Sequence, residues 1–367
     1  MLDMYDRLEV KFQNKPCYDI VLKDSFPDFI AELEALNLKS RKLCIVTDSN
    51  VSSIYLKSLQ EMLLSYTDKV VSFVFPAGED NKNLETVQNL YEFLIKESFD
   101  RNDVLLALGG GVVGDLTGYT AATYLRGIRF LQIPTSLLAM VDSSIGGKTG
   151  VDFKAYKNMV GAFYMPSCVY MNLECLKSLK ERVYLSGMGE IIKHGLIQDA
   201  AYYEWLKTNK DAIIGRDTKV LRQMVGRSCE IKRAVVEIDP HEQKERAWLN
   251  FGHTIGHAVE KWMEFTLLHG ECVAIGMVAS SYLSYQRGYL TKEELEDILT
   301  TLEAFHLPIS VKKLNVSNIL EALSRDKKMD AGQIKFILLR SIGEAVIDTT
   351  VTREELINAI EYIMLER

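Results

Sequence analysis

The chain has 367 residues, of which 47% are hydrophobic and 25% are charged, so it is long enough for two domains with substantial cores. Its formal net charge of −7 argues against nucleic acid or an anionic membrane surface as the main partner. The N-terminus lacks an apolar stretch of signal-peptide length, and no run approaches the ~18 apolar residues of a membrane span. The six cysteines are scattered without a Cys-x-x-Cys pair, which is typical of reduced thiols. We therefore expect a soluble, cytoplasmic protein.

The first half of the chain alternates strand and helix patterns. Residues 4–23 alternate apolar and polar positions around Asn14-Lys15-Pro16 and predict a β-hairpin. Helical patterns, which end near residues 66 and 96, separate the strands predicted at 42–48, 70–75 and 104–108. This βαβαβ order predicts a parallel sheet with helices on its faces. We assign this α/β domain to residues 1–175.

A glycine-rich segment follows the third of these strands. Gly109, Gly111 and Gly114 satisfy the Gly-x-Gly-x-x-Gly pattern between a strand and a helix. Glycine lets backbone amides approach a pyrophosphate, and the helix N-terminus favours its negative charge. About twenty residues later the chain has Pro134 instead of the usual ribose-binding acid, although acids stand near the ends of earlier strands. A nucleotide site and a simple tight turn are both compatible with this segment.

A second glycine segment ends in a lysine. Gly146-Gly147-Lys148-Thr149 resembles the end of a nucleoside-triphosphate P-loop, but the position of that motif's first glycine is occupied by Asp142. This mismatch excludes a P-loop triphosphatase. Lys148 is nevertheless well suited to a phosphate or an ionised oxygen, and Lys157 and Asn158 add donors nearby.

Long helical patterns replace the strands beyond about residue 175. Residues 199–245 predict amphipathic helices, a hairpin-like segment lies at 334–339, and a last helix closes the chain. We therefore predict a second, mostly α-helical domain over residues 176–367.

Three of the six histidines, His253, His257 and His269, cluster within this second domain. The first two are four residues apart in a helical pattern and share one face. Such clustering suggests a divalent metal such as zinc, although a pair of satisfied histidines in the core or on the surface has the same spacing. The His-Glu-x-x-His motif is absent, so a carboxylate is needed from elsewhere. Glu190 is our candidate, and its spacing to Lys193 would also suit a surface ion pair.

Taken together and in order, these motifs resemble those of the 3-dehydroquinate synthase family between about residues 42 and 340. The resemblance rests on Pro-Ala-Gly-Glu79, Gly-Gly-Gly-Val-Val-Gly-Asp115, the segment 134–149, Lys157-Asn158, Glu190-Ile-Ile-Lys193, Asn250-Phe-Gly-His253-Thr-Ile-Gly-His257 and Leu-His269-Gly-Glu.

The resemblance implies a Rossmann-like NAD-binding domain with a parallel sheet, followed by a mostly helical domain that binds metal and substrate. It implies that zinc or cobalt is held by Glu190, His253 and His269. It implies that NAD is held by Asp48, Glu79, Asp80, Lys82, Gly110, Gly111, Val112, Gly114, Asp115, Thr135, Ser136, Lys148, Lys157, Cys175 and Ser178.

The family's substrate is 3-deoxy-D-arabino-heptulosonate 7-phosphate, and its reaction belongs to the shikimate pathway of aromatic amino acid biosynthesis. A secondary alcohol is oxidised transiently at the expense of NAD, phosphate is eliminated, the hydride returns, and an intramolecular aldol closure gives 3-dehydroquinate. The resemblance assigns the substrate carboxylate to Lys232, Arg246 and Asn250. The phosphate end is assigned to Lys148, Asn158, Lys193 and Lys327 or Lys328, and Asp142 joins the catalytic set. His257 is the expected proton shuttle, and Arg126 reaches a neighbouring subunit's site, which implies a homodimer.

Several positions depart from the commonest family pattern. Ser136 stands where a second threonine is usual, Met140 where glutamine is usual, and Val151-Asp-Phe153 where Ile-Asn-His is frequent. Related sugar phosphate cyclases that form deoxy-inosose or valiolone rings are one alternative, but their substrates lack the carboxylate that Lys232 and Arg246 would bind. Metal-dependent polyol dehydrogenases and a non-catalytic NAD-binding protein are the others, and both leave the lysines of the phosphate end without a role.

Overall fold

A computed structural model describes residues 5–154, 156–240, 242, 244–264, 266–312, 314–329 and 335–365, without the side chains of 324–329. The chain divides into two compact units, Met1–Leu179 and Lys180–Arg367, here called the N-terminal and C-terminal units; the sequence predicts the boundary after residue 175. None of the helices in the described ranges combines the length and the apolar character needed to cross a membrane.

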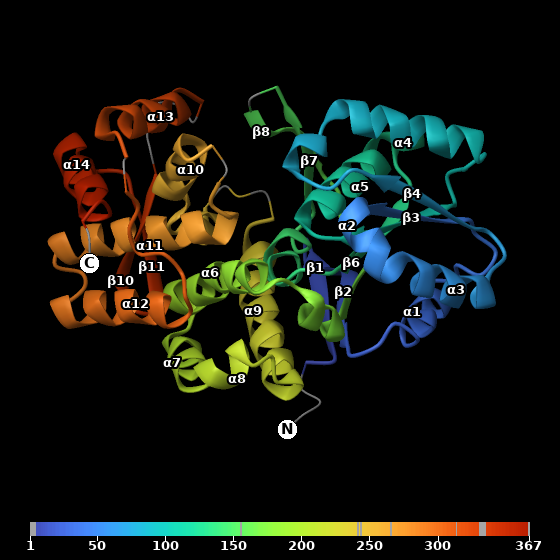
Figure 1. The fold of residues 1–367 in the computed structure, drawn as a ribbon, viewed down its shortest axis with the longest axis horizontal. Coiled ribbons are helices and arrows are strands. Elements are labelled where there is room, and N and C mark those ends of the chain that lie inside the picture. The colour runs from blue at the N-terminus through green and yellow to red at the C-terminus, as the bar shows by residue number, and fades with distance from the viewer. Residues whose placement is uncertain are drawn as a thin grey trace. The chain divides into compact units, whose positions relative to one another are not determined.

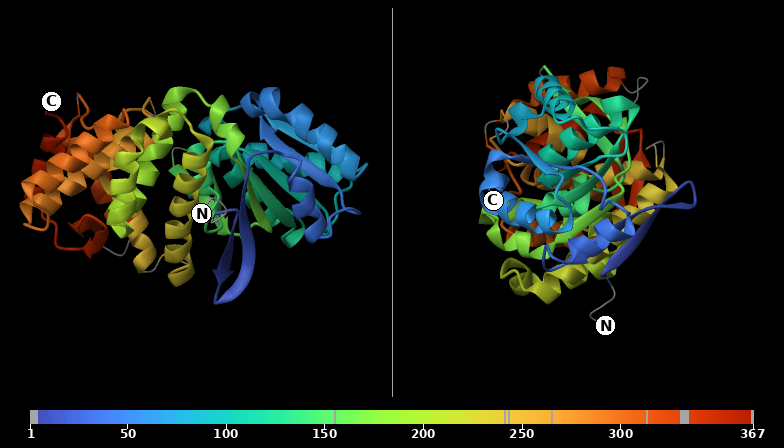
Figure 2. Two further views of the ribbon diagram at one scale, coloured as in Figure 1. Left: turned by 90° about the horizontal axis from the view of Figure 1, so that it is seen from below. Right: turned by 90° about the vertical axis from the view of Figure 1, so that its right-hand side faces the viewer.

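The N-terminal unit is built on a seven-stranded sheet in the order β1-β2-β9-β6-β5-β3-β4 (Figure 1). The strands are β1 Arg7–Phe12, β2 Lys15–Lys23, β3 Leu43–Asp48, β4 Val70–Phe75, β5 Val104–Gly109, β6 Arg129–Pro134 and β9 Cys168–Asn172. Only β1 is antiparallel to its neighbour, β2, and the other pairs are parallel. The predicted hairpin and the three predicted strands are confirmed, and Figure 2 shows the hairpin as a long ribbon.

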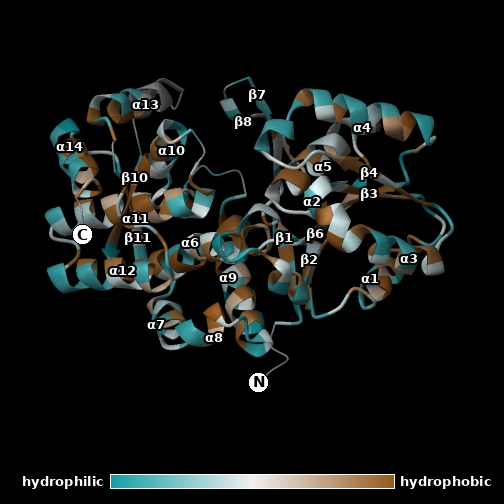
Figure 3. Ribbon diagram, in the orientation of Figure 1, coloured by the Kyte–Doolittle hydropathy of each residue, from teal (hydrophilic) through white to brown (hydrophobic). Residues whose placement is uncertain are grey.

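Helices cover both faces of this sheet because both faces of its strands are apolar. The helices are α1 Phe29–Ala35, α2 Ser49–Val51, α3 Lys57–Tyr66, α4 Leu84–Lys96 and α5 Gly111–Thr123. On β3, Leu43 and Ile45 pack in a cluster with residues of α1 and α3, whereas Cys44 and Val46 pack in a cluster with residues of α4 and α5. This alternation is the period-two pattern of a strand that is buried on both sides. The strands are accordingly brown in Figure 3, and α4 shows both colours along its length.

The sheet reverses its direction of growth between β3 and β5. From β3 the chain goes to β4 on one side, whereas β5, β6 and β9 follow one another on the other side. Ligands of open α/β sheets bind at such a reversal, outside the carboxyl ends of the strands. Asp48 ends β3, and Gly110 and Gly111 directly follow β5. Topology therefore places two of the predicted cofactor-binding segments at the same edge.

A second hairpin, which the sequence patterns did not predict, is formed by β7 Lys148–Phe153 and β8 Tyr156–Phe163. Gly118 of α5 lets β7 approach closely, since a Cβ at this glycine would lie 2.4 Å from Cγ2 of Thr149. Most of β8 is exposed, so the hairpin lacks the buried alternation by which a strand is recognised.

The C-terminal unit is mostly helical, as predicted. Its helices are α6 Glu181–Gln198, α7 Ala200–Thr208, α8 Lys210–Ile214, α9 Thr218–Ile238, α10 His253–Trp262, α11 His269–Gln286, α12 Lys292–Ala304, α13 Val316–Met329 and α14 Arg353–Tyr362. The predicted hairpin near residue 334 is observed as β10 Phe336–Ser341 paired with β11 Glu344–Asp348.

Helix α11 is buried along almost its whole length and crosses α6 and α10 at glycines. A Cβ at Gly270 would lie 1.8 Å from the carbonyl oxygen of Ser186 in α6. A Cβ at Gly276 would lie 1.8 Å from the carbonyl oxygen of Gly252, at the start of α10. Real Cβ atoms cannot occupy these positions, so only glycine permits the observed backbone separations. The crossings bring the middle of α6, which carries Glu190, to the first residues of α10 and α11, which are His253 and His269.

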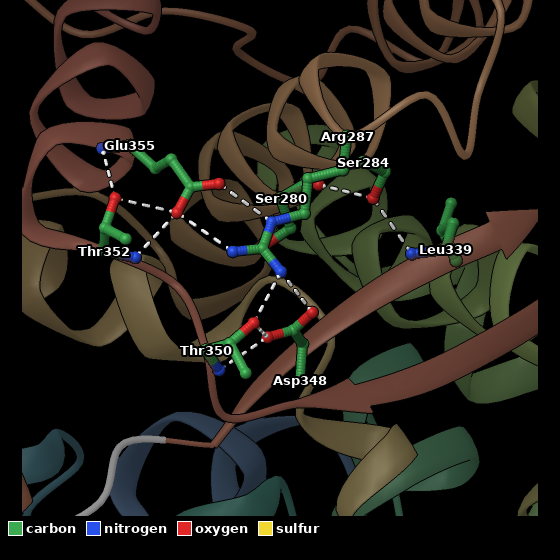
Figure 4. Close-up of polar contacts among 8 residues, drawn as sticks. All are labelled: Ser280, Ser284, Arg287, Leu339, Asp348, Thr350, Thr352 and Glu355. Atoms are coloured by element: carbon green, nitrogen blue, oxygen red, sulfur yellow. Dashed lines mark hydrogen bonds and ion pairs between the residues drawn. The ribbon is translucent and has the colours of Figure 1, made fainter.

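The far end of α11 is held by an arginine that joins three elements (Figure 4). Arg287 forms a bidentate pair with Glu355 at the start of α14, with two nitrogen–oxygen distances of 2.9 Å. Its Nη1 also donates to Asp348 at the end of β11 and to Thr350. Thr352 completes a capping box with Glu355. The hydrogen bond from Arg287 is the main cause that lowers the pKa of Glu355 to about 2.

Arg287→Met should lower the free energy of unfolding at pH 7 by about 2 kcal/mol, because it leaves two carboxylates without their cation. The folded state lowers the pKa of Glu355, so its contribution is complete above the ordinary carboxyl pKa of about 4.3 and disappears as the pH falls towards 2. Urea unfolding at several pH values should show the difference from wild type shrinking below pH ~4.5. Arg340→Met, which removes a mostly exposed partner of Glu344, is the control and should change stability by less than about 0.5 kcal/mol. If Arg287→Met were still less stable than wild type by the same amount at pH 2, the stabilisation would not come from the ionised carboxylates.

Candidate metal centre and cofactor edge

The residues expected at the cofactor edge lie at strand ends of the N-terminal unit. Asp48 caps α2, since its Oδ1 accepts hydrogen bonds from the backbone nitrogens of Asn50 and Val51 at 2.8 and 2.9 Å. Gly110 is the N-cap of α5 and provides no side-chain cap. A Cβ at Gly111 would lie 3.1 Å from Oγ of Ser143. The first amides of α5 therefore lack a side-chain cap, as an anion site at a helix N-terminus requires.

Several predicted residues converge on Lys82, whose side chain is only 4% exposed. Its Nζ lies 2.7 Å from Oε1 of Glu79 and 3.6 Å from Oδ2 of Asp115. It also donates to Oδ1 of Asn158 at 2.8 Å, and a carboxylate that the sequence did not single out, Asp152, lies 3.8 Å away. Residues predicted for cofactor and for substrate are thus joined by one ammonium group.

The surroundings of Lys82 change the pKa values of the groups in this cluster. Burial raises the pKa of Asp115 to about 7, against the opposing charge of Lys82. Burial also disfavours the charged form of Lys82, but the surrounding carboxylates of Asp115 and Glu79 outweigh it and raise the lysine's pKa. Lys82 is therefore a permanent cation, whereas Asp115 can exchange a proton near neutral pH.

The remaining predicted residues of the N-terminal unit are more dispersed. Ser178 Oγ lies 2.6 Å from the hydroxyl of Tyr55, and burial raises the pKa of the nearby Cys175 thiol to about 12. Thr135 donates from its backbone to Gly109 at 2.9 Å. Other side chains of the predicted set are exposed, namely Asp80, Arg126, Lys148 and Asn158; Val112, Gly114, Ser136, Asp142 and Lys157 are buried or half-buried.

In the C-terminal unit, three ligand candidates from three helices meet at one point. Oε1 of Glu190, from α6, lies 3.4 Å from Nε2 of His253 at the start of α10. The same oxygen lies 3.5 Å from Nε2 of His269 at the start of α11. His257 stands close by, with its ring centre 5.2 Å from that of His253 and 5.8 Å from that of His269, and it is exposed.

The arrangement fits a tetrahedral divalent cation. Zinc bonds of about 2.1 Å separate neighbouring ligand atoms by about 3.4 Å, which matches the separations from Glu190 Oε1. Oε2 of Glu190 is paired with the ammonium group of Lys193, whereas the buried Oε1 faces both imidazole nitrogens, so Oε1 is the oxygen placed to bind a cation together with the histidines. Glu190, His253 and His269 therefore fit zinc or a similar ion.

The two histidines that face Glu190 differ in their protonation. Burial and the charge of Lys193 lower the pKa of His253 well below its ordinary value. Burial would also lower the pKa of His269, but the neighbouring carboxylates of Glu190 and Glu260 raise it to about 9. Burial raises the pKa of Glu190 as well, yet Lys193 and the histidines lower it well below its usual range. His253 is thus a neutral imidazole, and a cation would displace the proton of His269.

The lysines and the arginine expected to bind substrate in this unit are buried, and Lys193 contacts the ligand cluster directly. Lys193 forms an ion pair with Glu190 and donates to the carbonyl of Leu249 at 2.6 Å. Arg246 is 2% exposed and donates to the carbonyl of Pro240 at 2.6 Å. Asn250 donates to Glu242 at 2.8 Å, and Lys232 on α9 is buried. Lys327 and Lys328 lie on α13, and their side chains are outside the described part of the structure.

Sequence reasoning missed three carboxylates that contact predicted residues. Asp152 lies beside Lys82, Glu242 accepts from Asn250, and Oε1 of Glu260 lies 3.9 Å from Nδ1 of His269. The signal for Glu260 was its helical spacing from His253 and His257. Asp152 lies within the Val151–Phe153 segment that departs from the common family pattern.

Glu190→Gln should lower zinc affinity by at least a factor of about 100, because a neutral amide is a poor metal ligand and leaves Lys193 without its partner. Chelator competition on the purified protein measures this directly. Glu181→Gln, at the exposed start of the same helix, is the control and should bind zinc as wild type does. Unchanged zinc affinity in Glu190→Gln would remove Glu190 from the ligand set.

Two family descriptions match consecutive segments of this chain. Residues 72–186 match the family description "3-dehydroquinate synthase N-terminal", and residues 187–329 match "3-dehydroquinate synthase C-terminal". A 3-dehydroquinate synthase of Acetivibrio thermocellus is 42% identical over 96% of this chain and 98% of its own length.

Solved structures share the fold over nearly the whole chain. One is 2-epi-5-epi-valiolone synthase from Streptomyces hygroscopicus subsp. jinggangensis, with NAD+ and Zn2+ bound; it is 29% identical, has a TM-score of 0.87 and covers 97% of this chain and 99% of its own. A 2-deoxy-scyllo-inosose synthase complexed with carbaglucose-6-phosphate, NAD+ and Co2+ is 24% identical, also has a TM-score of 0.87 and covers 96% of this chain and 99% of its own. The two family matches and the curated relative together show that the chain belongs to the 3-dehydroquinate synthase family.

Proposed function

We propose that this chain converts 3-deoxy-D-arabino-heptulosonate 7-phosphate to 3-dehydroquinate and phosphate, using NAD and a divalent metal. The observation that carries the proposal is a three-helix ligand set accompanied by buried Arg246 and Lys232 in the same unit. A buried arginine and lysine suit a substrate carboxylate. The valiolone and inosose synthases, which share the fold, act on substrates without one.

When bound, NAD supplies a reversible hydride acceptor, and the metal supplies a Lewis acid that acidifies the substrate hydroxyl. We assign the metal to Glu190, His253 and His269. His257 is one helical turn from His253 and remains exposed, so it can accept the hydroxyl proton of the alcohol that is oxidised and return it when the hydride returns.

In the N-terminal unit, the edge formed by Asp48 and the glycine loop would hold the cofactor. The uncapped amides at the start of α5 suit the pyrophosphate. Acidic side chains suit ribose hydroxyls, and Asp48 at the end of β3 and Glu79 in the segment after β4 are our candidates. The other members of the proposed cofactor set are Asp80, Lys82, Gly110, Gly111, Val112, Gly114, Asp115, Thr135, Ser136, Lys148, Lys157, Cys175 and Ser178.

Arg246, Lys232 and Asn250 would bind the substrate carboxylate in the C-terminal unit. Lys148 and Asn158 are exposed, and we assign them, with Lys193 and Lys327 or Lys328, to the phosphate until it leaves. Asp142 belongs to the proposed catalytic set without a phosphate contact, because a carboxylate repels that anion. A fixed phosphate keeps the leaving group aligned with the carbon–hydrogen bond that is broken, which lowers the entropy cost of elimination. Lys193 contacts Glu190 directly, so its ammonium group can also keep that carboxylate ionised.

Arg126 is proposed to complete the phosphate end of a second copy's site, which makes the protein a homodimer. The side chains of Arg126 and its neighbour Leu125 are exposed. Both residues have positive φ, 68° and 50°, a conformation that costs non-glycine residues free energy and recurs at functional turns.

A cytoplasmic location is part of the proposal. All six cysteines are free, and five of them are buried, as is usual where thiols stay reduced. Cell fractionation tests this, and recovery of the protein in a membrane or extracellular fraction would contradict it.

Purified protein should release phosphate from the heptulosonate phosphate with catalytic NAD and without net NADH, and a chelator should stop the release. Arg246→Ala should lower kcat/KM by a factor of about 100, as expected when a charge-assisted hydrogen bond to a carboxylate is lost. Arg353→Ala, at an exposed arginine of α14, is the control and should behave as wild type. Coupled phosphate and NADH assays measure both quantities.

Two outcomes would point elsewhere. Turnover of a heptulose or hexose phosphate without a carboxylate, unaffected by Arg246→Ala, would indicate a related cyclase. Net NADH from simple polyols would indicate a dehydrogenase.

Mixing inactive variants tests whether Arg126 acts on the other subunit. Arg126→Ala and Glu190→Gln should each be inactive as pure dimers. Co-expression should restore activity, because in a mixed dimer the site with intact Glu190 receives Arg126 from its partner. About a quarter of wild-type activity is expected from random pairing, in which half the dimers are mixed and each has one complete site. No recovery in co-purified mixed dimers would place Arg126 in its own subunit's site, whereas an active pure Arg126→Ala dimer would place it outside the chemistry.

A further inference from the structure

Asp152 and Asn158 belong to a bulged part of the β7–β8 hairpin. Val151 pairs with Val160 and Phe153 pairs with Tyr156, so the residues from Lys157 to Met159 bulge opposite Asp152. Within this bulge Asn158 has a φ of 53°. Bulges next to functional sites commonly redirect a side chain, and asparagine is among the few residues that tolerate this conformation.

Asp152 holds both sides of the bulge. Its Oδ1 accepts a hydrogen bond from the backbone nitrogen of Asn158 at 2.7 Å. Its own backbone nitrogen donates to the carbonyl of Lys82 at 2.8 Å. Asp152 Oδ1 also lies 3.8 Å from Nζ of Lys82. One residue therefore fixes the backbone of Asn158 relative to the lysine that its side chain contacts.

The contact with Lys82 decides which end of the Asn158 amide faces outward. An ammonium group has only donors, so the carbonyl oxygen of the amide must be the atom at 2.8 Å. The NH2 group then points away from Lys82, and among the described residues it donates to none. Asn158 is exposed. Its outward NH2 is a ready donor for an anionic oxygen.

We infer that Asp152 is a positioning residue that fixes Asn158 in this conformation, so that the amide NH2 is presented to the substrate phosphate. The inference rests on the proposed function. Oδ1 of Asp152 is the atom that positions Asn158, because it accepts the hydrogen bond from the backbone nitrogen of Asn158. An asparagine side chain has an acceptor oxygen at the same place. Aspartate and asparagine can therefore serve this role equally, and asparagine is frequent at this position in the family.

The test uses the NAD- and zinc-loaded protein and inorganic phosphate as the probe. Asp152→Ala should weaken phosphate binding in calorimetry by about tenfold and raise KM for the heptulosonate phosphate similarly, since one charge-assisted hydrogen bond to an anion is lost. Asp152→Asn should stay within about threefold of wild type, because it retains the acceptor. NAD affinity should change less than about twofold in both variants.

A double-mutant cycle with Asn158→Ala separates positioning from general stability. Asn158→Ala should match Asp152→Ala, and the double variant should lose no more than either single change. Asp103→Ala is the control, because Asp103 is buried and accepts from the backbone nitrogens of Lys42 and Asp100 at 2.9 and 2.8 Å. It should lower thermal stability without changing phosphate affinity.

Three results would each overturn the inference. The first is a loss of phosphate affinity in the double variant that equals the product of the two single losses. The second is an equal loss of phosphate affinity in Asp152→Asn and Asp152→Ala, and the third is a loss of NAD affinity as large as the loss of phosphate affinity. Asp152→Ser replaces the alanine variant if alanine prevents folding. Phosphate binding needs no turnover, so these results stay interpretable even if the wild-type protein fails to convert the heptulosonate phosphate, which would refute the proposed function alone.

Discussion

The C-terminal unit depends on the burial of one carboxylate. Glu190 is wholly inaccessible to solvent, and an isolated buried carboxylate would be too costly to retain. Lys193 and the imidazoles of His253 and His269 surround it. They can do so only because the glycines on α11 allow three helices to approach within the van der Waals distance of their backbones. Helix packing and metal affinity are therefore two results of the same crossing geometry.

The N-terminal unit has the complementary arrangement, a buried cation among acids. Lys82 contacts Glu79 and lies within 4 Å of Asp115 and Asp152. Removal of Lys82 would leave its acids without a cation, which is costly at a buried site, whereas removal of one acid would leave the others to balance the lysine. The cluster joins the loop after β4, the start of α5 and the β7–β8 hairpin. Residues proposed for cofactor and phosphate are consequently held in one electrostatic network.

The two ends of helix α11 make different contacts: one end contributes a candidate metal ligand, and the other end anchors the helix. Its first residue, His269, contacts Glu190, whereas its C-terminal end is held by Arg287 through Asp348 and Glu355. Ser284 near this end accepts the backbone N–H of Leu339 in β10 at 3.0 Å. These contacts fix the helix far from the chemistry, and its ligand-bearing end is held separately by the bidentate pair of Arg182 with Glu271.

The sequence by itself determined the strand–helix alternation, the helical second half and the chemical types of the candidate ligands. Periodic burial and glycine punctuation are local signals, so β3, β5 and the loop before α5 could be predicted from neighbouring residues alone. The histidine spacing likewise predicted a shared helical face for His253 and His257.

Tertiary structure alone decided which acids act together. Glu190 precedes His253 by dozens of residues, and Asp152 reaches Lys82 across a hairpin whose strands are too exposed to show a buried pattern. The outward direction of the Asn158 amide depends on a bulge and on a lysine from another loop. Burial, partner identity and pKa arise from groups that only the folded chain brings within a few ångströms, and no local pattern encodes that proximity.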